Sequence, residues 1–441
     1  MELSITADQV TRLATDASAA TAGRKLSAQK NWKNIGYNEK ALWGECQGSA
    51  LYQVRVELST LTTQCSCPSR KLPCKHSLGL LLLSANTPGA ITESEPPEWV
   101  VSWLAKRAAN QKRKETIAAG TTEKKPTDNA QKNKEKRQAK VKQGIEQLDL
   151  WLNDLIRNGL GSLESQSSSI WEQQAAQMVD AQATGLATSI RSMSATPHSS
   201  QRWSEKLLGQ LGKLALLTEA YQHIERAPEP LQEDIQQLIG WVRKEPEVLE
   251  HGAHVTDDWL FLGQHIDVIE RGRSQYTWLQ GITSGKTALL LQFSFAGAPF
   301  TENYPAGTRQ RAEIVYWPGA DPQRALCAQR QGEITAIKEP LPGVTTFDAF
   351  FEQVAQQLAR QPWRERFLCI LSSSQPIYEP EQQRWSLRDR DGQSLPLAPS
   401  SVEYWKLLAL SGGHPVDFVG EWDGETLLPL GLLVDHAYHL M

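Results

Sequence analysis

The sequence has no long hydrophobic run and few cysteines. Its longest apolar run, Leu78 to Leu83, is far shorter than the roughly 20 residues that a membrane-spanning helix needs. The first residues, MELSITADQV, lack the apolar core of a signal peptide. Six cysteines in 441 residues are too few for a disulfide framework. We therefore expect a cytoplasmic protein that makes no membrane contact and keeps its thiols reduced.

Catalytic motifs are also missing from the sequence. There is no G-x-S-x-G motif, no acidic pair in a convincing frame and no second cysteine–histidine pattern for nucleophilic catalysis. The segment Gly285-Lys286-Thr287 resembles the end of a phosphate-binding loop, but Gln280 stands where that motif requires glycine. The residues after it, TALLLQFSF, alternate like a strand, so a turn between two strands is the better interpretation. We expect no enzyme activity and identify no small-molecule substrate.

The sequence does contain a cluster of metal-ligating side chains, namely Cys65, Cys67, Cys74 and His76. Three thiolates and one imidazole complete a tetrahedral zinc set. Residues two apart on a strand point to the same side, so Cys65 and Cys67 can face one metal ion. Inside a helix such residues diverge, so Cys74 and His76 are expected on the turn that enters the next helix. The alternative is a set of ordinary thiols in a reduced compartment, and the density of the cluster favours a metal site.

The flanking residues predict the local structure around the cluster. LYQVRVEL (51–58) alternates in polarity and is typical of a strand. HSLGLLLLSAN, which begins at His76, reads as a helix that would pack on that strand. The isolated cysteines are best interpreted as small buried hydrophobic residues; they are Cys46, Cys327 and Cys369.

The chain is expected to be a multidomain α+β protein. A small ββα-like zinc module occupies 1–105, and a basic linker, 106–143, has almost no large apolar residues and is expected to be flexible or loosely helical. Residues 144–250 show apolar side chains at helical spacing and predict a helical domain. Residues 251–441 predict a mixed α+β domain, in which RWSLRDRDGQSLPL and EWDGETLLPLGLL each read as a hairpin with an Asp-Gly turn.

The spacing C-x-C, six residues, C-x-H resembles the signature of the SWIM zinc finger. The similarity extends through ALWGECQGSALYQVRVEL, CSCPSRKLPCKHSLGLLLL and PPEWVVSWLAKR, or roughly residues 30–107, and these segments resemble bacterial members of that family. It implies one structural zinc ion per chain, with Cys65, Cys67, Cys74 and His76 as ligands. It also implies DNA binding or protein interaction, with a partner from an AAA ATPase system.

Three hypotheses for the function follow. The first is a non-catalytic protein-interaction module, favoured by the formal net charge of −4 and by the large tryptophan-rich remainder of the chain. The second is DNA or RNA binding through the finger and the basic linker, although no aromatic residue in that linker could stack on bases. The third is an enzyme in the C-terminal half, which NTP hydrolysis lost in a Lys286→Ala chain would support.

Positive charges on the expected metal loop are the best local candidates for contact with nucleic-acid phosphates. They are Arg70, Lys71 and Lys75. Their alternative role is to screen the negative charge of the thiolates, and the basic linker could equally be a solvated spacer.

Overall fold

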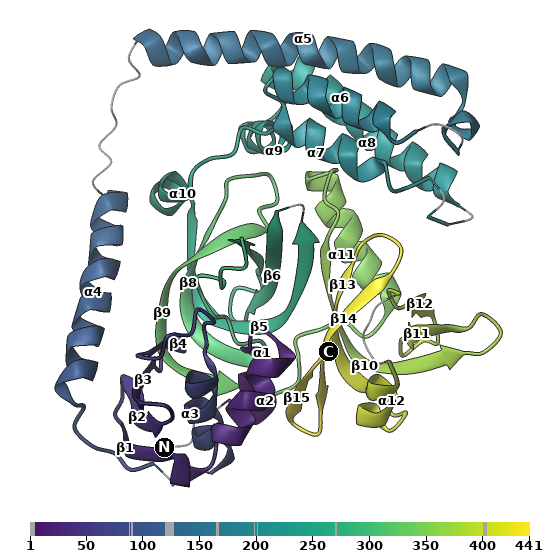
Figure 1. Ribbon diagram of the computed structural model, residues 1–441. Helices are drawn as coiled ribbons and strands as arrows, with labels where there is room; N and C mark the ends of the chain where they lie inside the picture. The colour runs from purple at the N-terminus through teal and green to yellow at the C-terminus, as the bar shows by residue number, and fades with distance from the viewer. Residues whose placement is uncertain are drawn as a thin grey trace.

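The computed structural model describes residues 5–87, 89, 91–119, 128–164, 167–197, 199–200, 202–269, 271–399 and 404–441. A small sheet with helices, a helical bundle, a closed barrel and a six-stranded sheet follow one another along the chain (Figure 1). The predicted mixed α+β class is thus confirmed. Across the described ranges, no helix is both long enough and apolar enough to cross a membrane.

The first part, here called the N-terminal module (residues 5–87), contains an antiparallel sheet in the order β1-β2-β3-β4. Its elements are α1 (Ala7–Arg12), α2 (Ala17–Leu26), η1 (Gln29–Asn31), β1 (Trp32–Tyr37), β2 (Ala41–Gln47), β3 (Leu51–Glu57), β4 (Thr62–Cys65) and α3 (Lys75–Asn86). The predicted strand and helix are β3 and α3, which with β4 form the expected ββα unit. The fully buried Val54 and Val56 of β3 share a core with Leu78, Leu80 and other leucines of α3.

Two glycines let α2 lie directly against α3. A Cβ atom on Gly23 would come within 2.7 Å of the Cβ of Leu78, and one on Gly79 within 2.8 Å of the Cβ of Leu26. Larger residues at either position would push the helices apart, because real Cβ contacts are not this short. The close approach places α2 beside the start of α3, where two of the predicted ligands lie.

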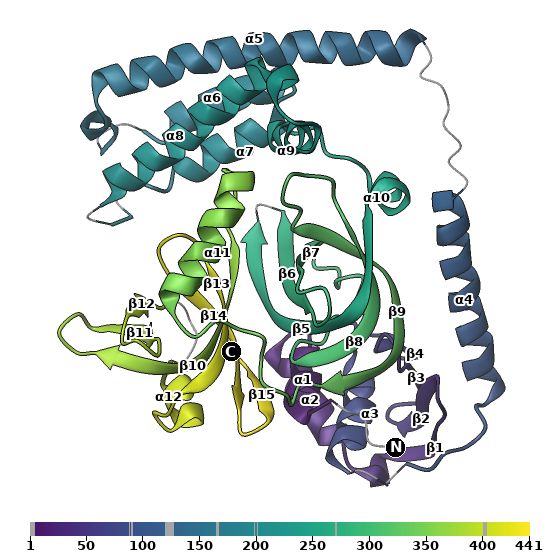
Figure 2. The same ribbon diagram turned by 180° about the vertical axis from the view of Figure 1, so that it is seen from behind.

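The stretch expected as a basic linker carries helix at both ends. α4 (Glu98–Ala119) continues into it and α5 (Asp128–Asn158) begins within it, while 120–127 lie outside the described residues. Its lysines, arginines, glutamines and alanines are strong helix formers, which accounts for helix in a stretch with almost no large apolar residues. α4 runs outside the barrel from the N-terminal module toward the bundle and contacts α10 (Glu245–His251) (Figures 1 and 2). The boundaries set at 106 and 143 stay predictions.

The middle of the chain is a helical bundle. It comprises α5, η2 (Leu160–Glu164), α6 (Ser169–Asp180), α7 (Thr184–Met193), α8 (Trp203–Gln222), η3 (Ile224–Arg226) and α9 (Glu229–Ile239). In α5, the buried residues Val141, Ile145, Leu148 and Leu152 recur at three- and four-residue spacing and face the core. α5 lies along one side of the other bundle helices (Figures 1 and 2).

Five strands of the C-terminal half close into a barrel in the order β5-β6-β7-β9-β8. They are β5 (Ala253–Ile269), β6 (Gly272–Gly281), β7 (Thr287–Phe295), β8 (Thr308–Tyr316) and β9 (Arg324–Ala336). One core of large buried side chains includes Trp259, Phe261 and Tyr304. A second core, which includes Trp278, Leu289 and Leu430, joins the barrel to the neighbouring sheet.

The last part is a six-stranded sheet in the order β12-β11-β10-β13-β14-β15. Its elements are α11 (Phe347–Arg360), β10 (Phe367–Glu379), β11 (Arg384–Arg388), β12 (Ser394–Pro396), α12 (Tyr404–Ser411), β13 (Val416–Trp422), β14 (Leu427–Val434) and β15 (Ala437–Leu440). Both predicted hairpins are present, as the pairs β11–β12 and β13–β14. Their turns contain Gly392 and Gly424, whose φ angles of 89° and 102° favour glycine.

The bundle contacts the barrel through a half-buried carboxylate on α9. Asp234 accepts a hydrogen bond of 2.8 Å from the backbone N–H of Ala320, in the loop between β8 and β9. Burial is the main reason that the pKa of Asp234 rises to about 6. The folded protein therefore binds a proton here more tightly than the unfolded chain does. This contact favours folding at low pH, and the benefit is lost as pH rises through about 6.

Asp234→Asn should consequently stabilise the chain at pH 7 and have little effect near pH 4. The amide oxygen can still accept the Ala320 N–H, while the cost of a desolvated charge disappears. We expect a gain on the order of 1 kcal/mol after allowing for screening by solvent. Urea unfolding at the two pH values measures it, with the exposed Asp154→Asn on α5 as a control. Equal effects of the two substitutions at pH 7 would contradict the assignment.

Candidate metal centre

The four predicted ligands meet where β4 ends and α3 begins. Cys65 is the last residue of β4, Cys74 is the N-cap of α3, and His76 lies in its first turn. Their ligand atoms and that of Cys67 all lie within 4.8 Å of one another. The structure thus brings together every residue of the predicted set, from a strand end and a helix start as the spacing required.

The distances between these atoms fit a tetrahedral zinc site. His76 Nδ1 lies 3.8 Å from Cys65 Sγ and 3.9 Å from Cys74 Sγ. Zinc bonds of about 2.3 Å to sulfur and about 2.0–2.1 Å to nitrogen place such atoms roughly 3.6 Å apart in a tetrahedron. These two distances therefore exceed the tetrahedral value by only a few tenths of an ångström, and the most widely separated ligand atoms, within 4.8 Å of one another, would close by at most about 1 Å on binding the ion. Three sulfurs and one imidazole nitrogen are also the donor types that zinc favours.

Local hydrogen bonds hold the ligands in place. Ser66, between the first two cysteines, donates its N–H to Gln53 O at 3.0 Å and accepts the Gln53 N–H on its hydroxyl at 2.9 Å. These two hydrogen bonds continue the β3–β4 pairing beyond the end of β4. The backbone of Ser66, between Cys65 and Cys67, is therefore held in place. At the helix start, Cys74 Sγ accepts the Ser77 N–H at 3.5 Å as an N-cap. The His76 ring is buried and contacts Tyr52, with the two ring centres 4.8 Å apart.

The electrostatics of the cluster favour negative charge at one sulfur. Hydrogen bonds from Cys65, His76 and Ser77, of which that from Cys65 has the largest effect, together lower the pKa of Cys74 to about 3. Donating this hydrogen bond to Cys74 raises the pKa of Cys65, and burial raises the pKa of Cys67. Cys74 is therefore ready to act as a thiolate ligand. The other two thiols would lose their protons when a cation binds, because thiolates are the ligating form.

Comparison with protein families gives two matches along the chain. Residues 52–84 match the SWIM zinc finger, and this range contains all four clustered side chains. Residues 52–84 therefore form a SWIM zinc finger. Residues 136–239 match the SWIM-associated four-helix bundle domain, which corresponds to α5–α9 of the helical bundle. Comparison with curated proteins finds no match, and comparison with solved structures finds none either.

The basic residues of the SWIM finger differ in their surroundings. Lys71 forms an ion pair of 2.6 Å with Asp16, the N-cap of α2, so part of its charge is neutralised within the molecule. Arg70 and Lys75 are exposed, and no side-chain hydrogen bond or ion pair joins them to the residues that the structure describes. Of the three residues predicted to contact nucleic acid, these two have charges available to a partner.

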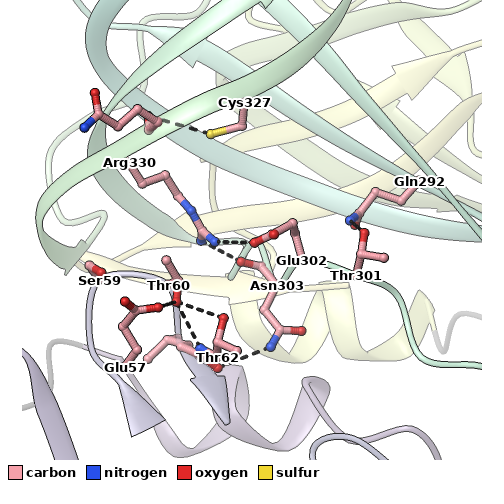
Figure 3. Close-up of polar contacts among 12 residues, drawn as sticks. Glu57, Ser59, Thr60, Thr62, Gln292, Thr301, Glu302, Asn303, Cys327 and Arg330 are labelled. Carbon is pink, nitrogen blue, oxygen red and sulfur yellow. Dashed lines mark hydrogen bonds and ion pairs between the residues drawn. The ribbon is translucent and has the colours of Figure 1, made fainter. Parts of the chain in front are cut away.

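The SWIM finger is hydrogen-bonded to the barrel half of the chain through the turn between β3 and β4. Asn303 donates its side-chain N–H to Leu61 O at 3.2 Å, and Gln310 donates to Ser59 O at 2.8 Å. Arg330 of β9 donates to Asn303 O at 2.7 Å and so holds the loop between β7 and β8 in position, as Figure 3 shows. Sequence reasoning missed these residues, because ordinary polar side chains far along the chain carry no local signal.

Cation–π contacts and an ion pair join the N-terminal module to α4. The guanidinium of Arg55 on β3 lies 5.4 Å from the ring centre of Trp99 and 5.7 Å from that of Trp103. Arg107 adds a 2.9 Å ion pair to Glu57. The repeat of Trp99, Trp103 and Arg107 at four-residue spacing is visible in the sequence and marks the face of α4 that packs on the sheet.

The segment resembling a phosphate-binding loop is a turn between β6 and β7, as predicted. Asp257 caps it by accepting the N–H groups of Thr283 and Ser284 at 3.2 and 2.7 Å. Lys286 lies over the ring of Tyr316, 6.0 Å from its centre. A carboxylate thus receives the backbone donors that a phosphate would need, and strand follows where the motif requires helix.

Proposed function

We propose that the protein acts as a non-catalytic protein-interaction module, and that one structural zinc ion stabilises the fold of its N-terminal module. The ligands are Cys65, Cys67, Cys74 and His76. The observation that supports this proposal is the closed donor set, since four protein ligands leave no open position for a substrate or an activated water. When bound, the ion supplies a cross-link between the end of β4 and the start of α3.

The proposed interaction surface is the loop between the two cysteine pairs. Pro68, Ser69 and Arg70 are exposed, and so is Leu72, with 45% of its surface accessible. A zinc cross-link at both ends of this loop would fix its shape and reduce the entropy that binding costs. The contacts with the barrel and with α4 support the same role, because they present the loop from a rigid body. We place the protein in the cytoplasm, with a partner of the AAA ATPase kind that the SWIM resemblance implies.

Leu72→Asp tests the interaction role without touching a ligand. We expect the variant to keep its zinc and to lose a cross-linked protein partner that the wild-type chain captures in cells. Charge on an exposed apolar contact residue disrupts a desolvated interface and leaves the fold intact. Leu150→Asp on α5 is the matched control, because Leu150 is 67% exposed and lies in the bundle. Equal capture by both variants, or no captured partner, would contradict the proposal.

Nucleic-acid binding is the second candidate, favoured by the exposed and unpaired charges of Arg70 and Lys75 beside the metal centre. Phosphate contacts would make binding to duplex DNA or RNA fall steeply with salt. Fluorescence anisotropy of the full chain with short duplexes, at low and moderate salt, separates the two functions. Salt-steep binding that weakens in an Arg70→Ala, Lys75→Ala chain would favour this candidate over the interaction module.

A further inference from the structure

A large hollow lies where the N-terminal module, α4 and the barrel meet. It encloses about 1250 Å3 and is lined by the β1–β2 turn, the β3–β4 turn, one face of α4 and the tip of β9. A second hollow of about 920 Å3 continues it along β8 and β9, since both include Ile5, Gly332 and Glu333. We call the first hollow the α4 groove. It is separate from the four zinc ligands, none of which lines it.

One wall of the α4 groove is an apolar stripe on a helix. Val101, Leu104, Ala105 and Ala108 recur at the i, i+3, i+4, i+7 spacing of a single helical face and all line the groove. The face that carries Trp99 and Trp103 packs on the sheet instead. The stripe is poorly covered, because Val101 keeps 48% of its surface exposed and both alanines are exposed. Such a stripe with small residues is suited to the close approach of another helix.

The floor of the groove is also apolar. Leu58 and Leu61 come from the β3–β4 turn, and Ile334 comes from β9. Leu61 and Ile334 belong to the buried core of the N-terminal module, so the floor is rigid. Apolar groups on two sides would favour a ligand that buries an apolar face of its own.

The rim of the groove carries an excess of negative charge. Glu39, Glu93 and Glu333 are exposed lining residues, whereas Lys40 is the one cation that lines it among the described residues. No side-chain hydrogen bond or ion pair joins these three carboxylates to any residue that the structure describes. A fourth, Glu57, is neutralised by Arg107. The unpaired carboxylates would attract lysine or arginine side chains.

We propose that the α4 groove binds a basic amphipathic helix of a partner protein. The apolar face of that helix would pack on Val101, Leu104 and Ala105, and its cationic residues would pair with the carboxylates of the rim. Binding of this kind follows the helix-in-groove mode, in which apolar anchors recur at helical spacing. The inference rests on the proposed interaction role and names the chemistry of the partner.

A designed peptide tests this with the full-length chain. The probe is a peptide of about 16 residues, about 24 Å long as a helix, with leucine on one face and lysine on the others. We expect it to bind the wild-type chain in isothermal titration calorimetry. A Glu39→Lys, Glu93→Lys, Glu333→Lys chain should bind it about tenfold more weakly or worse, since three rim charges are reversed. Ala105→Glu, on the exposed wall, should weaken binding as well.

The control is Glu381→Lys, which reverses an exposed carboxylate on the β10–β11 hairpin away from the groove. Equal binding by the control and the triple variant, absence of binding to the wild-type chain, or equal binding of a peptide with glutamate in place of lysine would each overturn the inference. Zinc content and thermal unfolding verify that each variant is folded. Leu72→Asp should leave peptide binding intact, so failure of the groove is distinguishable from failure of the proposed interaction loop.

Discussion

Replacing Cys67 with serine should strip the protein of zinc and unfold its N-terminal module. A serine hydroxyl does not replace a thiolate ligand, and structural zinc contributes about 10–16 kcal/mol of apparent binding free energy in small finger peptides. Cys67 is only half-buried, so its substitution removes little packing. The loss of structure would therefore follow from the loss of metal. Zinc per chain, measured by mass spectrometry, and circular dichroism of the same sample report the two effects.

Cys327→Ser is the matched control for this experiment. Cys327 lies on β9, outside the metal cluster, and burial raises the pKa of its thiol to about 11. The Cys327→Ser chain should retain one zinc ion and a folded N-terminal module. A Cys67→Ser chain that kept its zinc would refute the ligand assignment, because the ion would then be bound without the Cys67 thiolate.

Arg366→Met should strongly destabilise the junction between the barrel and the six-stranded sheet. Arg366 contacts Glu421, a carboxylate on β13 with a side chain only 4% exposed, and forms a 3.1 Å ion pair with Asp267 on β5. Glu421 also accepts the indole N–H of Trp278 at 2.6 Å. Removing the arginine leaves a buried carboxylate without its cation, which costs about 3–5 kcal/mol. Urea unfolding of the full chain measures this loss.

The surface pair Arg384–Glu379 provides the comparison for that loss. Arg384 is 44% exposed and lies 2.8 Å from Glu379 on the β10–β11 hairpin. An exposed ion pair contributes less than about 1 kcal/mol, so Arg384→Met should leave the unfolding midpoint nearly unchanged. Similar losses for the two arginines would mean that the junction is hydrated and that Glu421 is not dependent on its partner.

The metal centre could be predicted from the sequence because its determinants are local. All four ligands lie between residues 65 and 76, and strand alternation on one side and helix periodicity on the other determine where their side chains point. The Asp-Gly turns at Gly392 and Gly424 were equally predictable, since left-handed backbone conformations favour glycine.

Long-range pairing could not be predicted in the same way. The barrel closes through a short parallel contact of Leu289 and Leu290 on β7 with Arg324 and Ala325 on β9, and neither segment carries a signal for the other. The hydrogen bond that the Asn303 side chain donates to Leu61 O joins residues far apart in the sequence. The α4 groove likewise results from tertiary placement, although its apolar helical stripe is visible in the sequence.

X-ray absorption spectroscopy of the full-length protein at the zinc edge tests the central claim most directly. The account predicts one zinc ion per chain with three sulfur ligands at about 2.3 Å and one nitrogen ligand at about 2.0–2.1 Å. It also predicts that this signal disappears in the Cys67→Ser chain. A coordination shell with bound water or carboxylate oxygen, or a purified chain without zinc, would contradict it.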